Sequence, residues 1–195
     1  MTSASVILTR EEQRTRVDVT LGMIFFIGSW AMTFGTIFLS FLVLRQRIGV
    51  WPPEGIALPS FPLASAATAI LIASSVLIHR AARCGQRGEA GFARLWSAGL
   101  ILGLGFAALQ AWLWLDLIGA GRLPTSGLYE SLFFGLTWIH ATHVVLGLAA
   151  LAWALIGFSL QRYDAHKFTT ISNIAIFWHF VDVVWIVLFL GIFVF

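Results

Sequence analysis

Five long runs of apolar residues, separated by short polar segments, dominate the sequence. A helix needs about 20 apolar residues to cross the hydrocarbon core of a bilayer. The pattern therefore predicts an all-α, polytopic membrane protein built as a bundle of five transmembrane helices. The predicted spans cover residues 19–44, 63–78, 95–118, 128–160 and 168–195.

The segments between the runs carry the residues that interrupt regular structure. Residues 51–62 contain four prolines and a glycine, which predicts an irregular loop without a helix. Residues 80–94 are basic and rich in glycine, and we expect a second loop there. The remaining connections, residues 119–127 and 161–167, are short, so consecutive helices should pack antiparallel.

Basic residues fall mostly on one side of the predicted bundle. By the positive-inside rule, this side is cytoplasmic, which places the N-terminus in the cytoplasm and the C-terminus in the periplasm. We accordingly divide the chain into a cytoplasmic arm, residues 1–18, and a single five-helix domain, residues 19–195. The basic residues assigned to the cytoplasmic side are Arg10, Arg14, Arg16, Arg80, Arg83, Arg87, Arg94, Arg162 and Lys167, and those assigned to the other side are Arg45, Arg47 and Arg122.

Composition agrees with a membrane protein and excludes some other classes. Hydrophobic residues make up 59% of the chain and charged residues 11%, whereas soluble domains carry about 25% charged residues. The net charge is +3, but no basic cluster is interleaved with aromatic residues, so we expect no nucleic-acid partner. The single cysteine, Cys84, excludes an internal disulfide.

Four ionisable residues interrupt the last two apolar runs: His140, His143, His179 and Asp182. Each pair has i, i+3 spacing and therefore shares one helix face. At about 1.5 Å per residue, both pairs lie roughly 17 to 20 Å from the outer ends of their helices, so they could be level with each other. A carboxylate at this depth costs about 2.5 to 3.5 kcal/mol. We therefore expect these side chains to face the bundle or a partner subunit.

Three interpretations of this group are open. The favoured one is a structural hydrogen-bond network that locks the last two helices together. A proton path is the second, because chains of His and Asp act as relays in membranes, although the other helices offer few titratable groups. A metal site formed by the HATH and HFVD segments is the third, and a total of only five histidines weighs against it.

Two sequence motifs carry a specific resemblance. The segment HATHVVLG, residues 140–147, followed by WHFVDVVW, residues 178–185, resembles subunit III of haem-copper terminal oxidases, the cytochrome c oxidase subunit III family, in its five-helix form. The segment WPPEGI, residues 51–56, is also similar to that family, and the resemblance covers nearly the whole chain from Gly22 onward. The residues that match the family signature are Trp51, Pro52, Pro53, Gln110, Trp178 and Trp185.

The resemblance implies a non-catalytic subunit of a proton-pumping oxidase that reduces O₂ in the aerobic respiratory chain of a bacterial inner membrane. It implies that this chain holds no haem, copper or other metal and has no catalytic residue. The expected partners are subunit I, with haem and copper B, subunit II, other respiratory complexes and bound phospholipid. His140, His143, His179 and Asp182 are then structural, and the candidate contacts for lipid headgroups are Arg80, Arg83 and Arg162.

Several alternatives remain at this stage. The electron donor is expected to be cytochrome c, with a quinol oxidase as the alternative. An accessory protein of nitric oxide reductase and a stand-alone metalloenzyme or transporter are further hypotheses. The chain also departs from the family: Trp30 stands where many members carry a glutamate, and Ser172 and Leu113 stand near two other acidic positions. Functions tied to those acids are not implied here.

Overall fold

The computed structural model describes residues 10–48, 59–87, 89, 91–159 and 167–194. All regular structure in these ranges is helical, and five of the helices are long and apolar enough to cross a membrane. The predicted all-α, five-span architecture is therefore confirmed. The elements are α1 (Arg10–Ile48), α2 (Phe61–Arg87), α3 (Phe92–Gly119), α4 (Leu128–Ser159), α5 (Lys167–Phe189) and a short π-helical turn, η1 (Leu190–Val194).

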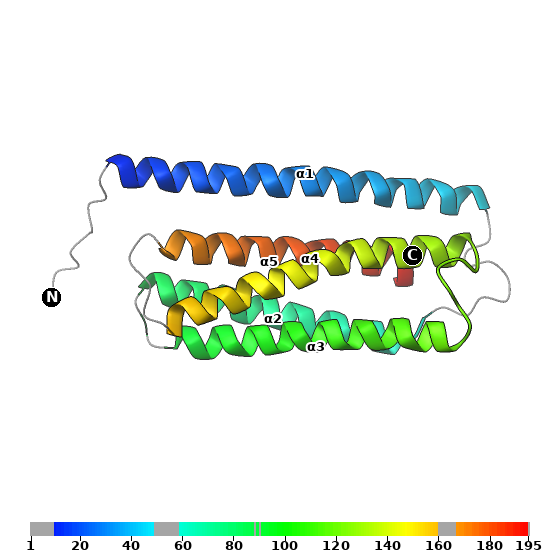
Figure 1. Cartoon of the computed structure of the whole chain (residues 1–195). Coiled ribbons are helices and arrows are strands. Elements are labelled where there is room, and N and C mark those ends of the chain that lie inside the picture. The colour runs from blue at the N-terminus through cyan, green and yellow to red at the C-terminus, as the bar shows by residue number, and fades with distance from the viewer. Residues whose placement is uncertain (1–9, 49–58, 88, 90, 160–166, 195) are drawn as a thin grey trace.

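The helices run up and down, so that α1, α3 and α5 begin at the end of the bundle where α2 and α4 finish (Figure 1). The antiparallel packing predicted for the last two helices is confirmed, because α4 and α5 contact each other and run in opposite directions. The α2–α3 pair has the most extensive contact in the bundle. In contrast, α1 lies on one side of the others and packs mainly on α5 and less on α4. Which end faces the cytoplasm stays a prediction.

Two boundaries differ from the sequence prediction. The second helix was expected over residues 63–78 with a loop over 80–94, but α2 continues to Arg87. The segment after residue 78 is rich in Arg and Ala. Both residue types favour helices, so the helix continues although the arginines are too polar for the membrane core. The first helix likewise begins at Arg10, inside the predicted N-terminal arm. Most of the proline-rich loop, residues 51–58, lies outside the described residues, and Pro62 occupies the first turn of α2, where its missing N–H is harmless.

Close packing of α2 against α3 depends on Gly99. A Cβ atom at this position would lie 2.7 Å from Cδ1 of Ile78 and 3.3 Å from the carbonyl oxygen of Ser74. The hydroxyl of Ser74 donates a hydrogen bond of 2.7 Å to the carbonyl of Gly99, so a side chain of α2 also bonds the backbone of α3. Gly99 therefore has a role in helix packing, because small residues allow helices in lipid to approach closely.

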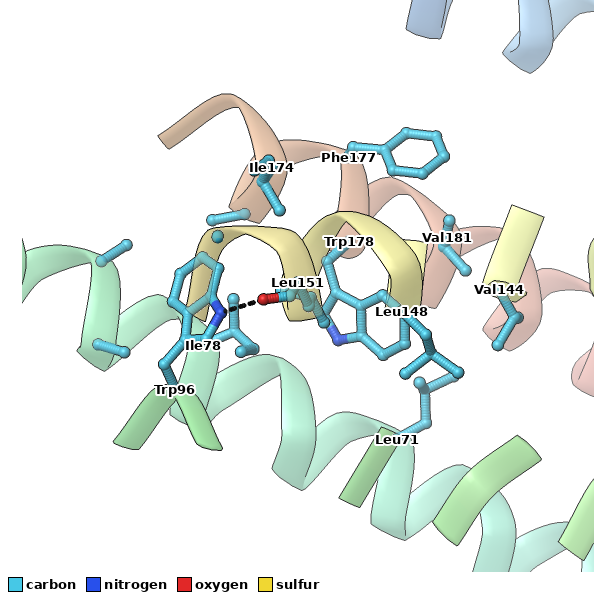
Figure 2. Close-up of a cluster of buried hydrophobic side chains, with 14 of the residues drawn as sticks. Leu71, Ile78, Trp96, Val144, Leu148, Leu151, Ile174, Phe177, Trp178 and Val181 are labelled. Carbon is cyan, nitrogen blue, oxygen red and sulfur yellow. Dashed lines mark hydrogen bonds between the residues drawn. The ribbon is translucent and has the colours of Figure 1, made fainter. Parts of the chain in front are cut away.

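Trp178 fills the centre of the larger hydrophobic cluster, between α2, α3 and α4 (Figure 2). Its ring would contact a Cβ at Gly103 at 2.8 Å and a Cβ at Gly147 at 2.7 Å, so glycines on two helices make room for one indole. Its Nε1–H donates to the hydroxyl of Ser74 at 3.2 Å. The signature tryptophan therefore fixes the position of α5 relative to three neighbouring helices.

Two other buried indoles also have hydrogen-bond acceptors on a neighbouring helix. Trp96 on α3 donates to the carbonyl of Leu151 on α4 at 2.9 Å (Figure 2). Trp185 on α5 donates to the hydroxyl of Thr68 on α2 at 2.9 Å. A buried indole usually finds a partner for its N–H, and here each such bond joins residues on two different helices.

Candidate functional site

The four ionisable residues singled out from the sequence lie in two separate groups. His140 and His143, on α4, are surrounded by aromatic rings from other helices. His179 and Asp182, on α5, instead meet α2. The surroundings of the two groups support different roles.

His143 lies against α1. The centroid of its ring is 4.1 Å from that of Trp30, at an angle of 76°, and 5.1 Å from that of Phe34. Its Nδ1 is 2.8 Å from the carbonyl oxygen of Ile139, one turn back on the same helix, so Nδ1–H donates to that carbonyl. Trp30 thus packs edge-on against this imidazole.

His140 is buried between three helices and is only 1% exposed. Its ring stacks on Trp185 of α5, with centroids 5.4 Å apart and planes at 29°. Phe106 of α3 and Phe34 of α1 approach its edges, each at 6.4 Å. Neither ring nitrogen has a hydrogen-bond partner among the described residues. This histidine therefore joins α4 to its neighbours through ring packing.

His179 and Asp182 converge on Ser75, near the middle of α2. The hydroxyl oxygen of Ser75 lies 2.6 Å from Nδ1 of His179, and Asp182 lines the same pocket. His79, one turn further along α2, places its ring centroid 5.6 Å from that of His179. These side chains line a polar pocket of about 400 Å³ between α2 and α5. The pocket residues are Ile72, Ser75, Val76, His79, Arg80, Arg83, His179 and Asp182.

The expected pairing of the α5 acid with the α4 histidines is therefore replaced by bonds to α2. The reason is the helical period: Trp178 and Trp185, seven residues apart, point into the bundle, whereas His179 and Asp182 share a different face of the same helix. That face meets α2. A single network that locks α4 to α5 is not what the structure shows.

The arrangement also does not support the metal-site hypothesis. Across the described ranges, no three His, Cys, Asp or Glu side chains are grouped closely enough to hold an ion. The HATH and HFVD segments face different neighbours, so their side chains do not converge.

Sequence reasoning missed two members of the α2–α5 pocket, Ser75 and His79. Ser75 is a common residue type in a membrane helix, and His79 directly follows the second apolar run, next to the basic segment. A usable signal was their spacing, because Ser75, His79 and Arg83 follow each other at i, i+4 along one face of α2.

The other residues named from the sequence have varied surroundings. Gln110 is buried on α3, and its carboxamide has no hydrogen-bond partner within the part of the chain that the structure describes. Arg80 and Arg83 are exposed and line the pocket between α2 and α5. Trp51, Pro52, Pro53 and Arg162 lie outside the described residues.

Comparison with known proteins decides the family. The sequence model of the family "Cytochrome c oxidase subunit III" matches residues 2–195. The chain belongs to this family. It is therefore a subunit of an oxidase complex, and its five apolar helices make it a multi-pass membrane protein of the subunit III type.

Curated subunit III relatives match nearly all of the chain. The "Probable cytochrome c oxidase subunit 3" of Nocardia farcinica is 33% identical over 98% of this chain and 96% of its own length. The "Cytochrome c oxidase subunit 3" of Corynebacterium diphtheriae is 34% identical over 90% of this chain and 87% of its own length. The protein of the same name from Paracentrotus lividus is 36% identical over 88% of this chain but only 67% of its own length.

Proposed function

We propose that this chain is the non-catalytic subunit III of a proton-pumping haem-copper terminal oxidase in a bacterial inner membrane. It packs beside subunit I, which carries haem and copper B, and subunit II completes the assembly. The family match over residues 2–195 and the bacterial relatives of nearly equal length support this assignment. In this role the chain contributes a scaffold, and the redox chemistry takes place in its partners.

The observation that carries the scaffold role is the packing of the two α4 histidines. The ring of His140 is stacked on Trp185, and that of His143 is 4.1 Å from Trp30. Aromatic pairs of this kind contribute about 0.5 to 1.5 kcal/mol beyond the area that they bury. Imidazoles held in this way connect α4 to α1 and α5, which supports a structural role for them.

Two features support lipid binding. A groove of about 290 Å³ lies between α1 and α5, and its lining is almost wholly apolar, as an acyl chain requires. Phe34 and Phe38 contribute from α1, and Val183 and Val187 from α5. At the basic end of α2, the exposed side chains of Arg80 and Arg83 can reach the level of headgroup phosphates. Arg162 remains a further candidate outside the described residues.

The proposed electron donor is cytochrome c, in line with the names of the relatives. The test is to purify the tagged chain from its native membrane in mild detergent and to identify the retained proteins by mass spectrometry. We expect oxidase subunits I and II, haem absorption, a copper A signal and oxidation of reduced cytochrome c. Quinol oxidation without a copper A signal would establish that the chain belongs to a quinol oxidase. Retained nitric oxide reductase subunits would establish that it is an accessory protein of that enzyme.

A further inference from the structure

Gln110 on α3 and His140 on α4 are buried inside the bundle, with exposed fractions of 4% and 1%. Neither the carboxamide atoms of Gln110 nor the ring nitrogens of His140 have a hydrogen-bond partner in the ranges that the structure describes. At about 1.5 Å per residue, Gln110 lies roughly 14 Å inside the end of α3, within its apolar span. Buried polar groups nearly always have a partner, so these two side chains require one.

The two side chains lie at the same level of neighbouring antiparallel helices. Phe106, Gln110 and Trp114 follow each other at i, i+4 along one face of α3. Trp114 donates to the hydroxyl of Thr137 at 3.2 Å, and the ring centroids of Phe106 and His140 are 6.4 Å apart. Gln110 is midway between these two contacts, which places it beside the turn of α4 that carries Thr137 and His140.

The other polar groups around this position are already paired. The hydroxyl of Thr137 donates to a backbone carbonyl of its own helix at 2.8 Å and accepts from Trp114. The ring of Trp185 stacks on His140, and its Nε1–H donates to the hydroxyl of Thr68. These neighbours therefore supply neither the donors nor the acceptors that the carboxamide and the imidazole require.

The chemistry of the unpaired atoms decides which ligand fits. A carboxamide offers two N–H donors and an acceptor oxygen, and a neutral imidazole offers one donor and one acceptor. A ligand between them must therefore donate and accept, which an acyl chain cannot do, and neither group carries a charge that would hold an ion. Water donates twice and accepts twice, and a buried water typically bonds about three otherwise unpaired polar groups.

We propose that a water molecule is bound between α3 and α4, where it bridges the carboxamide of Gln110 and the imidazole of His140. Ring packing fixes the plane of this imidazole, and the water bonds its edge. The inference goes beyond the proposed function and does not depend on it, because it concerns only groups within this chain.

The first test uses X-ray radiolysis, which converts bound water into hydroxyl radicals that oxidise adjacent side chains. The chain is purified with its native partners, irradiated briefly and digested for mass spectrometry. Trp185, which contacts His140, should gain oxygen several times faster than Trp178, although both indoles are 0% exposed. In Gln110→Met, Trp185 should react no faster than Trp178.

The second test is the sign of a stability change. With water bound, Gln110→Met removes one partner of the water and weakens its bond to His140, so the melting temperature should fall by roughly 2 to 4 °C or more. Without water, methionine would replace an unpaired polar group by an apolar one of similar size, and the melting temperature should rise. Leu113→Met, a volume-conserving change at a buried apolar position of α3, is the control and should have the smaller effect.

The two tests together separate a bridging water from the other arrangements. A direct bond between Gln110 and His140 would also make Gln110→Met destabilising, but it would leave Trp185 as unreactive as Trp178. Equal labelling of the two indoles in the wild-type chain, labelling of Trp185 that persists in Gln110→Met, or a higher melting temperature of this variant overturns the inference.

Discussion

The hydroxyl oxygen of Ser75 on α2 lies 2.6 Å from Nδ1 of His179 on α5, although 104 positions separate the two residues in sequence. Asp182, less than one turn further along α5, lines the same pocket. The WHFVDVVW segment is thus bonded to the second helix through His179. This contact gives the histidine of the WHFVDVVW segment a structural role within this chain.

Substitution of Ser75 by alanine should destabilise the protein. It leaves Nδ1 of His179 without its partner, which costs about 1 to 3 kcal/mol. For a chain of this size, each kcal/mol lowers the melting temperature by roughly 2 to 4 °C. The melting temperature of the detergent-solubilised complex measures the effect. Ser40→Ala is the control, because Ser40 only bonds the carbonyl of Thr36 on its own exposed helix face, and an equal loss there would contradict the prediction.

Two substitutions of Asp182 should differ in their effect on assembly. Asp182→Asn keeps a polar side chain of the same shape in the pocket beside Ser75 and His179 and should leave the yield of complex near that of the wild type. Asp182→Leu removes a buried polar group next to Ser75 and His179, at a cost of about 1 to 3 kcal/mol, so less complex should accumulate. Quantitative recovery of the oxidase from membranes measures both. Wild-type recovery for the leucine variant would show that the polar group at this position is dispensable.

Gly103→Ala should destabilise the bundle, because its new Cβ would lie 2.8 Å from the Trp178 ring and 2.9 Å from a methyl group of Leu148. Overpacking of this kind costs about 1 to 3 kcal/mol. The matched control is Gly105→Ala, two residues along α3, where the nearest atom is 3.9 Å away. That control should be neutral or gain about 0.5 to 1 kcal/mol from the better helix former. Thermal denaturation that ranks the two variants the other way would contradict the packing.

Arg45→Met should loosen the attachment of α1 to the end of α5. Nη1 of Arg45 donates a hydrogen bond of 2.8 Å to the carbonyl of Gly191 in the π-helical turn η1. Bonds that involve a charged group contribute about 1.5 to 3 kcal/mol. We expect faster hydrogen–deuterium exchange in the peptide that contains η1, and no change for Arg47→Met, whose side chain is exposed. Unchanged exchange in both variants would show that the bond does not hold η1.

The sequence was sufficient to predict the number of helices, because each run of apolar residues is long enough to cross a bilayer. It was less informative about where a helix ends. In α2 the helix outlasts the apolar run by about nine residues, through Arg80 and Arg83 to Arg87. Hydropathy indicates whether lipid or water surrounds a segment, whereas helix propensity favours or disfavours its helical conformation. At the C-terminal end of α2 the residues are too polar for the membrane core but still favour a helix.

For the candidate site, the sequence identified the unusual residues but not their partners. His179 and Asp182 stand out because they interrupt an apolar run. Which helix they meet depends on the rotation of α5 about its axis, and this rotation is set by Trp178 and Trp185 together with glycines on α3 and α4. Such long-range packing is not encoded in local spacing. The prediction therefore joined the two nearest helices in sequence, and the structure joins α5 to α2.

The position of α1 has a consequence for how the chain is made. It leaves the ribosome before the other helices, yet its main contacts are with α5 and α4, the last two to be synthesised. Only 11% of its apolar stretch is buried inside the chain, against 56% for the last span. During biogenesis α1 must therefore remain in the bilayer without most of its contacts while α2 to α5 are inserted. It can pack against α4 and α5 only when translation is nearly complete.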